Sequence, residues 1–126
     1  MEQCIKEQKS LEVIITIVDR GKGNRVTELF NEQGFYNNIV CLGRGTATSE
    51  ILDYLGLGET EKDVVISTVL QGRDKELLGI LERELNLNKP GNGIAFTLSI
   101  KSVGGQATLQ FMTSLLREDR RDREDK

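Results

Sequence analysis

The sequence contains no histidine. Ser-His-Asp triads, Cys-His nucleophile pairs, histidine general bases and most zinc sites all need an imidazole ring. An enzyme built on this chain would have to use carboxylates, lysine, cysteine or tyrosine alone. We therefore expect a protein without catalytic residues or metal ligands.

Aromatic residues and cysteine are scarce as well. There is no tryptophan, aromatic residues make up 5% of the 126 residues, and the two cysteines are Cys4 and Cys41. The core must then be built mainly from valine, isoleucine and leucine. Two cysteines without a pairing pattern are typical of a reducing cytosol, where both stay thiols. Because Cys41 lies inside an apolar run, we expect it to be a buried core thiol.

Long apolar runs and an excess of positive charge are also absent. No run approaches the roughly 18 residues of a membrane span, and residues 1–10 are too polar for a secretion signal. The formal net charge of -3 gives no long-range attraction to phosphate backbones, which argues against a dedicated nucleic-acid binder. We expect a cytoplasmic protein that does not insert into membranes.

Four strands and two helices are predicted from hydrophobic periodicity. Asn24 is a candidate N-cap of the first helix, Gly34 lies at its C-terminal cap, and leucines at helical spacing mark the second helix over residues 77–85. Residues 13–18 form a nearly continuous apolar run, typical of a central strand buried on both faces. The predicted strands cover residues 13–18, 36–42, 64–70 and 94–100.

The order strand-helix-strand, repeated once, predicts an α+β fold. We expect a ferredoxin-like βαββαβ sandwich, with a four-stranded antiparallel sheet and two helices on one face. The other face is also apolar, so we expect oligomerisation or the C-terminal extension, residues 106–116, to cover it. Residues 1–10 are interpreted as a flexible leader, 11–116 as the domain, and 117–126 as a charged, disordered tail.

Glycine-rich turns are the candidate anion-binding sites. Backbone N–H groups of such turns can hold an anion together with a basic side chain. A strand-end bulge and a tight turn are the structural alternatives for the first two turns. A third turn, residues 19–23, precedes a helix N-terminus, which also attracts anions, although we favour a turn with solvated charges there. The candidate residues of the first two turns are Gly43, Arg44, Gly45, Thr46, Lys89, Gly91, Asn92 and Gly93.

A long polar connection, residues 48–62, separates the second and third predicted strands. Hairpin loops usually have about two to five residues, so this length indicates a functional loop. Its acidic residues could hold a cation, and its apolar residues could dock on a partner or form a short helix that packs on its own chain. The candidate partner-binding residues are Glu50, Ile51, Tyr54 and Leu55.

Two blocks resemble the P-II nitrogen-regulatory signalling proteins. L-G-R-G-T-A-T-S-E-I-L-D-Y-L-G-L-G-E, residues 42–59, resembles a divergent branch of that family. K-P-G-N-G-I-A-F, residues 89–96, is similar to the family's loop before the last core strand, usually G-K/R-x-G-D-G-K-x-F. The resemblance extends from about Leu11 to Gly105.

The resemblance implies a homotrimeric regulator of nitrogen metabolism whose uncovered sheet faces pack together. It also implies ATP or ADP as an effector, bound between subunits by the two glycine turns, with no other cofactor. Residues 43–63 would be the T-loop, which docks on a transporter, an enzyme or a regulator. We do not transfer the family's tyrosine modification to Tyr54, because the loop sequence differs.

The sequence departs from the family at the phosphate contacts. Ile94 stands where the family usually has lysine, Asn92 replaces aspartate, and residues 102–108 lack the family's arginines. Each missing charge-assisted contact is worth about 1.5–3 kcal/mol, enough to weaken a triphosphate site by orders of magnitude. One alternative is therefore a trimer that binds another small anion, such as bicarbonate or a carboxylate. Another is a small phosphatase that uses Arg44 or Lys89 with an aspartate.

Overall fold

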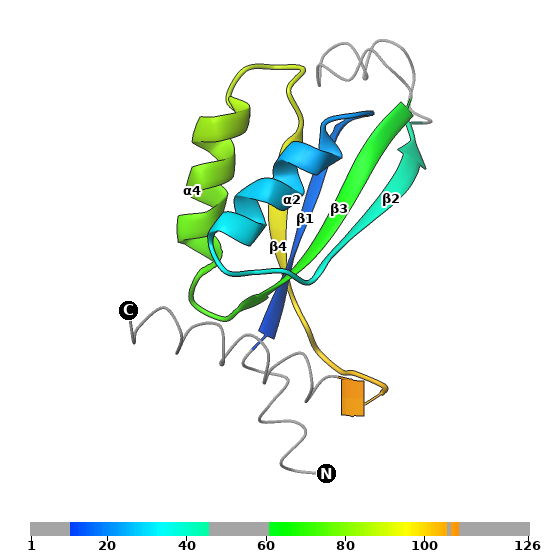
Figure 1. Ribbon diagram of the computed structural model, residues 1–126, viewed down its shortest axis with the longest axis vertical. Coiled ribbons are helices and arrows are strands. Elements are labelled where there is room, and N and C mark those ends of the chain that lie inside the picture. The colour runs from blue at the N-terminus through cyan, green and yellow to red at the C-terminus, as the bar shows by residue number, and fades with distance from the viewer. Residues whose placement is uncertain (1–10, 46–60, 106, 109–126) are drawn as a thin grey trace.

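The protein folds as a four-stranded antiparallel sheet with two helices on one face (Figure 1). The computed structural model describes residues 11–45, 61–105 and 107–108, and the structural statements below concern these residues. The strand order is β2-β3-β1-β4, so the predicted ferredoxin-like fold is confirmed. The elements are β1 (Leu11–Asp19), α2 (Gly23–Glu32), β2 (Asn38–Arg44), β3 (Glu61–Leu70), α4 (Asp74–Leu85) and β4 (Ile94–Ser99).

The strand register brings four strand termini together at one end of the sheet. Asp19 pairs with Lys62, Arg44 pairs with Glu61, and Ile94, the first residue of β4, pairs with Ile17. The last residues of β1 and β2 therefore lie beside the first residues of β3 and β4. We call this the glycine end, because both predicted glycine turns adjoin it. The opposite end, where Leu11 pairs with Leu70, is the far end.

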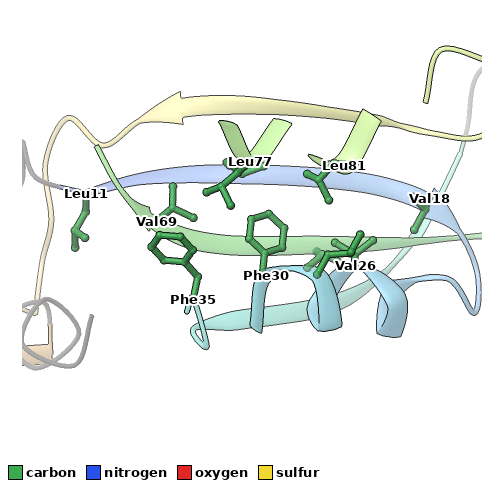
Figure 2. Close-up of a cluster of buried hydrophobic side chains, with 11 residues drawn as sticks. Leu11, Val18, Val26, Phe30, Phe35, Val69, Leu77 and Leu81 are labelled. Carbon is green, nitrogen blue, oxygen red and sulfur yellow. The ribbon is translucent and has the colours of Figure 1, made fainter. Parts of the chain in front are cut away.

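The core lies between the sheet and the two helices (Figure 2). It is almost wholly aliphatic, as the composition predicted, and only Phe30 and Phe35 contribute aromatic rings. Helix α2 packs Val26, Leu29 and Phe30 inward, and α4 packs Leu77 and Leu81. This spacing is the one that a helix needs to bury one face.

Strand β1 is not buried on both faces, contrary to the sequence prediction. Ile14 and Val18, on the helix side, are 0% exposed, whereas Ile15 and Ile17 are partly exposed. The reason is that neither α2 nor α4 covers the second face, which we call the open face. A central position in the sheet supplies hydrogen bonds on both sides, but it does not cover both faces.

The open face carries large apolar side chains from several strands. Directly paired residues share a face, so the partners Ile15, Ile66 and Phe96 define it across three strands. Exposed apolar residues on this face include Ile39, Ile94 and Leu98, at 57%, 51% and 47% exposure. Cys41 also lies on β2, opposite Val64, and is exposed, so the expected buried thiol is wrong. Val64 pairs in turn with Ile17, so Cys41 lies on the open face, which neither helix covers.

The start of helix α2 also differs from the prediction. The helix begins at Gly23 with Lys22 at the N-cap and no side-chain cap, so Asn24 is not the N-cap. A residue distant in sequence satisfies these amides instead, because Asp63 of β3 accepts the N–H groups of Gly21 and Gly23 at 2.9 and 3.0 Å. The other end is as predicted, since Gly34 has a left-handed φ of 92°. Strand β3 begins at Glu61 rather than Val64.

The end of α4 is closed by the turn that leads into β4. Asn86 takes a left-handed φ of 53°, and the side-chain amide of Asn92 donates to the carbonyl of Asn86 at 2.9 Å and to that of Leu85 at 3.5 Å. These carbonyls are at the helix C-terminus, where a donor is needed. Asn92 thus has a structural role that the aspartate usual in the P-II family could not fill, because a carboxylate has no N–H to donate.

We expect Asn92→Asp to lower the free energy of unfolding by about 1–2 kcal/mol, because it removes the donor and places a negative charge at a helix C-terminus. Urea unfolding followed by circular dichroism measures this. Asn88→Asp is the matched control, since Asn88 is exposed in the same turn and should change stability by much less. Equal losses in both variants would contradict the capping role.

We expect Asp63→Ala to cost about 2–4 kcal/mol of unfolding free energy. Two backbone donors would lose their acceptor and Arg20 would lose one of its two carboxylate partners, and an unsatisfied buried group costs about 1–3 kcal/mol. Glu76→Ala is the control, because Glu76 makes an ion pair with Arg73 at 2.8 Å but is 56% exposed, and such pairs are worth about 1 kcal/mol or less. A loss for Asp63→Ala no larger than the control's would refute the anchoring role.

Candidate functional site

The first glycine turn leaves the sheet at the end of edge strand β2. Gly43 and Arg44 are the last paired residues of that strand, opposite Lys62 and Glu61, and Gly45 follows directly. A side chain at Gly43 would place its Cβ 3.0 Å from Val64. Both ends of the predicted T-loop belong to strands, with Gly43 and Arg44 in β2 and residues 61–63 in β3. Thr46 lies outside the described residues.

The second glycine turn has a structural explanation for two of its residues. Gly93 has φ 118°, and a Cβ there would lie 2.5 Å from the carbonyl oxygen of Ile17. Only glycine permits this approach of the turn to β1. The amide of Asn92 is engaged with α4, as described above. Anion binding remains a prediction for the four candidate residues of this turn. The groups best placed to bind an anion are the exposed side chain of Lys89 and the N–H of Gly91, which has φ 104°.

The two glycine turns lie at the same end of the sheet but at opposite edges. One adjoins β2, the other adjoins β4, and β3 and β1 lie between them. Three strand spacings of about 4.8 Å separate the two edges by about 14 Å. A single chain therefore does not bring the two turns together into one small-anion site.

The third candidate turn, residues 19–23, is not available to an external anion. The carboxylate of Asp63 already occupies the position in front of helix α2 where an anion would bind. The anion that the sequence analysis considered at this turn is thus a carboxylate of the same chain. The signal was correct, since a helix N-terminus does attract negative charge, but the charge comes from β3.

Arg20 ties this turn to both strands that flank the long connection. Its guanidinium donates to the carbonyl of Gly43 at 3.3 Å and lies 3.4 Å from Glu61 and 3.6 Å from Asp63. The end of β2 and the start of β3 are thus held by one side chain. Sequence reasoning did not single out this role, because it depends on a register that no local pattern reveals.

Lys62 is a second residue that sequence reasoning missed. It pairs with Asp19 across β1 and β3, and its side chain is 5% exposed in an ion pair with that carboxylate. A buried ammonium group without such a partner would be costly. With Lys62 and Arg20 neutralised by carboxylates, these two cations are unavailable to a ligand.

Three other cations near the glycine end remain free for a ligand. Lys22, Arg44 and Lys89 are exposed and make no ion pair within the part of the chain that the structure describes. They flank the β1–α2 turn, the end of β2 and the α4–β4 turn. This rim can attract a small anion, and no group of three or more His, Cys, Asp or Glu among the described residues could hold a metal ion.

The predicted partner-binding residues Glu50, Ile51, Tyr54 and Leu55 lie outside the described residues. Two acidic residues at the end of the predicted T-loop, residues 43–63, are Glu61 and Asp63, and both lie in β3 and pair with Arg20. They therefore belong to the anchor of the turn rather than to a cation site in the loop. No helix in the described ranges is long and apolar enough to cross a membrane.

Comparison with known proteins gives likeness in structure only. No protein-family model and no curated protein sequence matches the chain. A structure of PII from Arabidopsis thaliana bound to citrate matches with a TM-score of 0.56 and 15% identity, over 79% of this chain and 83% of that one. A functionally unknown protein from Pediococcus pentosaceus matches with a TM-score of 0.55 and 12% identity, over 77% and 98%. The chain thus has a ferredoxin-like fold of the P-II type, in a divergent sequence.

Proposed function

We propose that this protein is a P-II-like regulator of nitrogen metabolism. It senses a small anionic effector in clefts between the subunits of a homotrimer, and it regulates a partner protein through the long connection between β2 and β3. The observation that carries the proposal is the position of the two glycine turns, which lie at one end of the sheet but at its opposite edges. A site that uses both turns needs a second copy of the chain.

Antiparallel pairing of sheet edges would supply that second copy. β2 runs toward the glycine end and β4 runs away from it. If two copies keep their glycine ends on the same side, β2 of one can therefore pair with β4 of the next. Residues 43–45 of one copy would then lie beside residues 89–93 of its neighbour. Repeating this head-to-tail contact three times closes a ring.

The apolar open face supports the same assembly. Its side chains come from strands at both edges of the sheet, with Ile39 on β2 and Ile94, Phe96 and Leu98 on β4 between 37% and 57% exposed. Exposed apolar surface of this kind marks an interaction site. In the proposed trimer the three open faces pack against one another around the axis, which removes this surface from water.

The charge at the glycine end supports an anion as the effector. Arg44 and Lys89 would approach each other across the proposed subunit boundary, and neither is neutralised by a described carboxylate. Two cations and several backbone N–H groups suit a compact anion. ATP and ADP are the effectors that the resemblance implies. The Arabidopsis PII structure contains citrate, which makes a tricarboxylate a reasonable probe here.

A second candidate keeps the trimer but replaces the nucleotide with a smaller anion. Ile94, at the position where the P-II family has lysine, is apolar, 51% exposed and lies on the open face, so it contributes no charge to a triphosphate. A carboxylate metabolite or bicarbonate needs fewer contacts. A phosphate-processing enzyme is a third candidate, but the absence of histidine narrows its acid–base chemistry. We propose a protein without catalytic activity that acts in the cytoplasm.

The trimer is tested by light scattering of the purified full chain. We expect the mass of three chains for the natural sequence and of one chain for Phe96→Asp, because a charge would then be buried in the contact. Tyr36→Asp is the control, since Tyr36 is 59% exposed and precedes β2 in a loop. It should stay trimeric. A natural protein that is monomeric at high micromolar concentration would disprove the assembly.

The effector is tested by calorimetric titration with ATP, ADP and citrate in turn. We expect about one site per chain for at least one of them, weakened about 10- to 100-fold by Arg44→Gln or Lys89→Gln, as for loss of a charge-assisted hydrogen bond. Lys75→Gln, an exposed cation on α4, should bind as the natural protein does. Heat from citrate alone would favour the second candidate.

Absence of binding by every probe would discard the effector site as proposed. Turnover of a phosphate ester that disappears in Arg44→Ala would instead establish the third candidate.

A further inference from the structure

A cavity of about 250 Å³ lies near the far end of the sheet, away from the glycine end. Leu11 of β1 and Thr68 of β3 line one side of it, and Ile100 and Val103, from the chain that follows β4, line another. Thr68 pairs with Val13, which alternates with the helix-facing Ile14, so Thr68 lies on the open face of the sheet.

The lining of the cavity is apolar and uncharged. Leu11 is 1% exposed and Thr68 is 8% exposed. The remaining lining residues, Gly104, Gly105 and Thr108, are exposed, so the cavity reaches the surface. Among the residues that the structure describes, none that lines the cavity is ionisable. A charged ligand would lose hydration here without gaining a partner, which is costly, whereas an apolar group would leave water favourably.

The volume limits the size of the ligand. An apolar cavity of about 150 Å³ in another protein is known to stay dry and bind benzene, and pockets for drug-sized ligands begin at about 300 Å³. A cavity of about 250 Å³ therefore holds a molecule somewhat larger than benzene. It cannot enclose a nucleotide, so it is not part of the proposed effector cleft.

From the size, the apolar lining and the presence of a buried threonine, Thr68, we infer that this cavity is a binding site for a small uncharged molecule. The ligand has a compact hydrocarbon ring or branched alkyl group and one oxygen that hydrogen-bonds to Thr68. The inference does not rest on the proposed effector site, because the cavity is at the opposite end of the sheet from the glycine turns. It requires only that the far end of the open face stays accessible in the assembled protein.

The test uses the full chain with labelled methyl groups and follows their nuclear magnetic resonance signals during titration with cyclohexanol. We expect saturable shifts confined to methyl groups near the cavity, such as those of Leu11, Ile100 and Val103. Cyclohexanecarboxylate has the same ring but carries a charge. It should cause no saturable shift of these signals at the same concentrations.

Two variants examine the contacts. Gly104→Leu adds a side chain at the cavity where a Cβ would meet no atom within 4 Å, so the fold should persist while cyclohexanol binding weakens at least tenfold. Thr68→Val keeps the shape but removes the hydroxyl and should weaken binding about fivefold, the effect of one neutral hydrogen bond. Gly79→Leu is the matched control, since a Cβ at Gly79 on α4 also meets no atom within 4 Å.

Several results would overturn the inference. One is the absence of saturable shifts for cyclohexanol up to its solubility limit. Another is equal binding by the natural protein and Gly104→Leu, with both folded by circular dichroism. A third is a response centred on the methyl groups of Ile39 and Ile94, which would show that the alcohol binds elsewhere on the open face. Equal affinity of the charged and uncharged ring compounds would also exclude the proposed ligand class.

Discussion

The arrangement of the glycine end depends on one buried carboxylate. Asp63 accepts the N–H groups of Gly21 and Gly23 and lies 3.6 Å from the guanidinium of Arg20. It thereby supplies the negative charge that the start of α2 needs and ties the β1–α2 turn to β3. Because Arg20 also reaches β2 through the carbonyl of Gly43, three strands are linked through neighbouring contacts. Carboxylates of this network neutralise Arg20 and Lys62, whereas the exposed cations at its rim make no ion pair with a described residue.

The second constraint is the cover of the sheet on one face only. The helices bury Ile14, Val18 and Val65 completely, while apolar residues on the other face stay in contact with water. One chain thus satisfies the backbone hydrogen bonds of β1 and β3 but leaves the apolar side chains of the open face exposed to water. The two glycine turns are also separated within one chain, because they lie at opposite edges of its sheet. Association of several copies would cover the open face and bring glycine turns of neighbouring copies together.

The sequence predicted the order and type of every described element, because hydrophobic periodicity is a local signal that packing here reinforces. The sequence did not predict the contacts that depend on strand register. Nothing local to Asp63 marks it as the cap of α2, and nothing near Lys62 identifies Asp19 as its partner. Cys41 was misjudged because an apolar run does not show which face of the sheet the helices leave uncovered. The glycine-rich sequence correctly indicated the two candidate turns. Their position at opposite edges of the sheet is known only from the strand order.

Gly93 bears on how glycine signatures are compared between proteins. Its close approach to the carbonyl of Ile17 excludes any side chain, so selection for a stable fold alone would preserve glycine at this position. A descendant that had lost every ligand would still carry it. A glycine shared at this position is therefore a sign of common architecture and is no evidence of a common ligand.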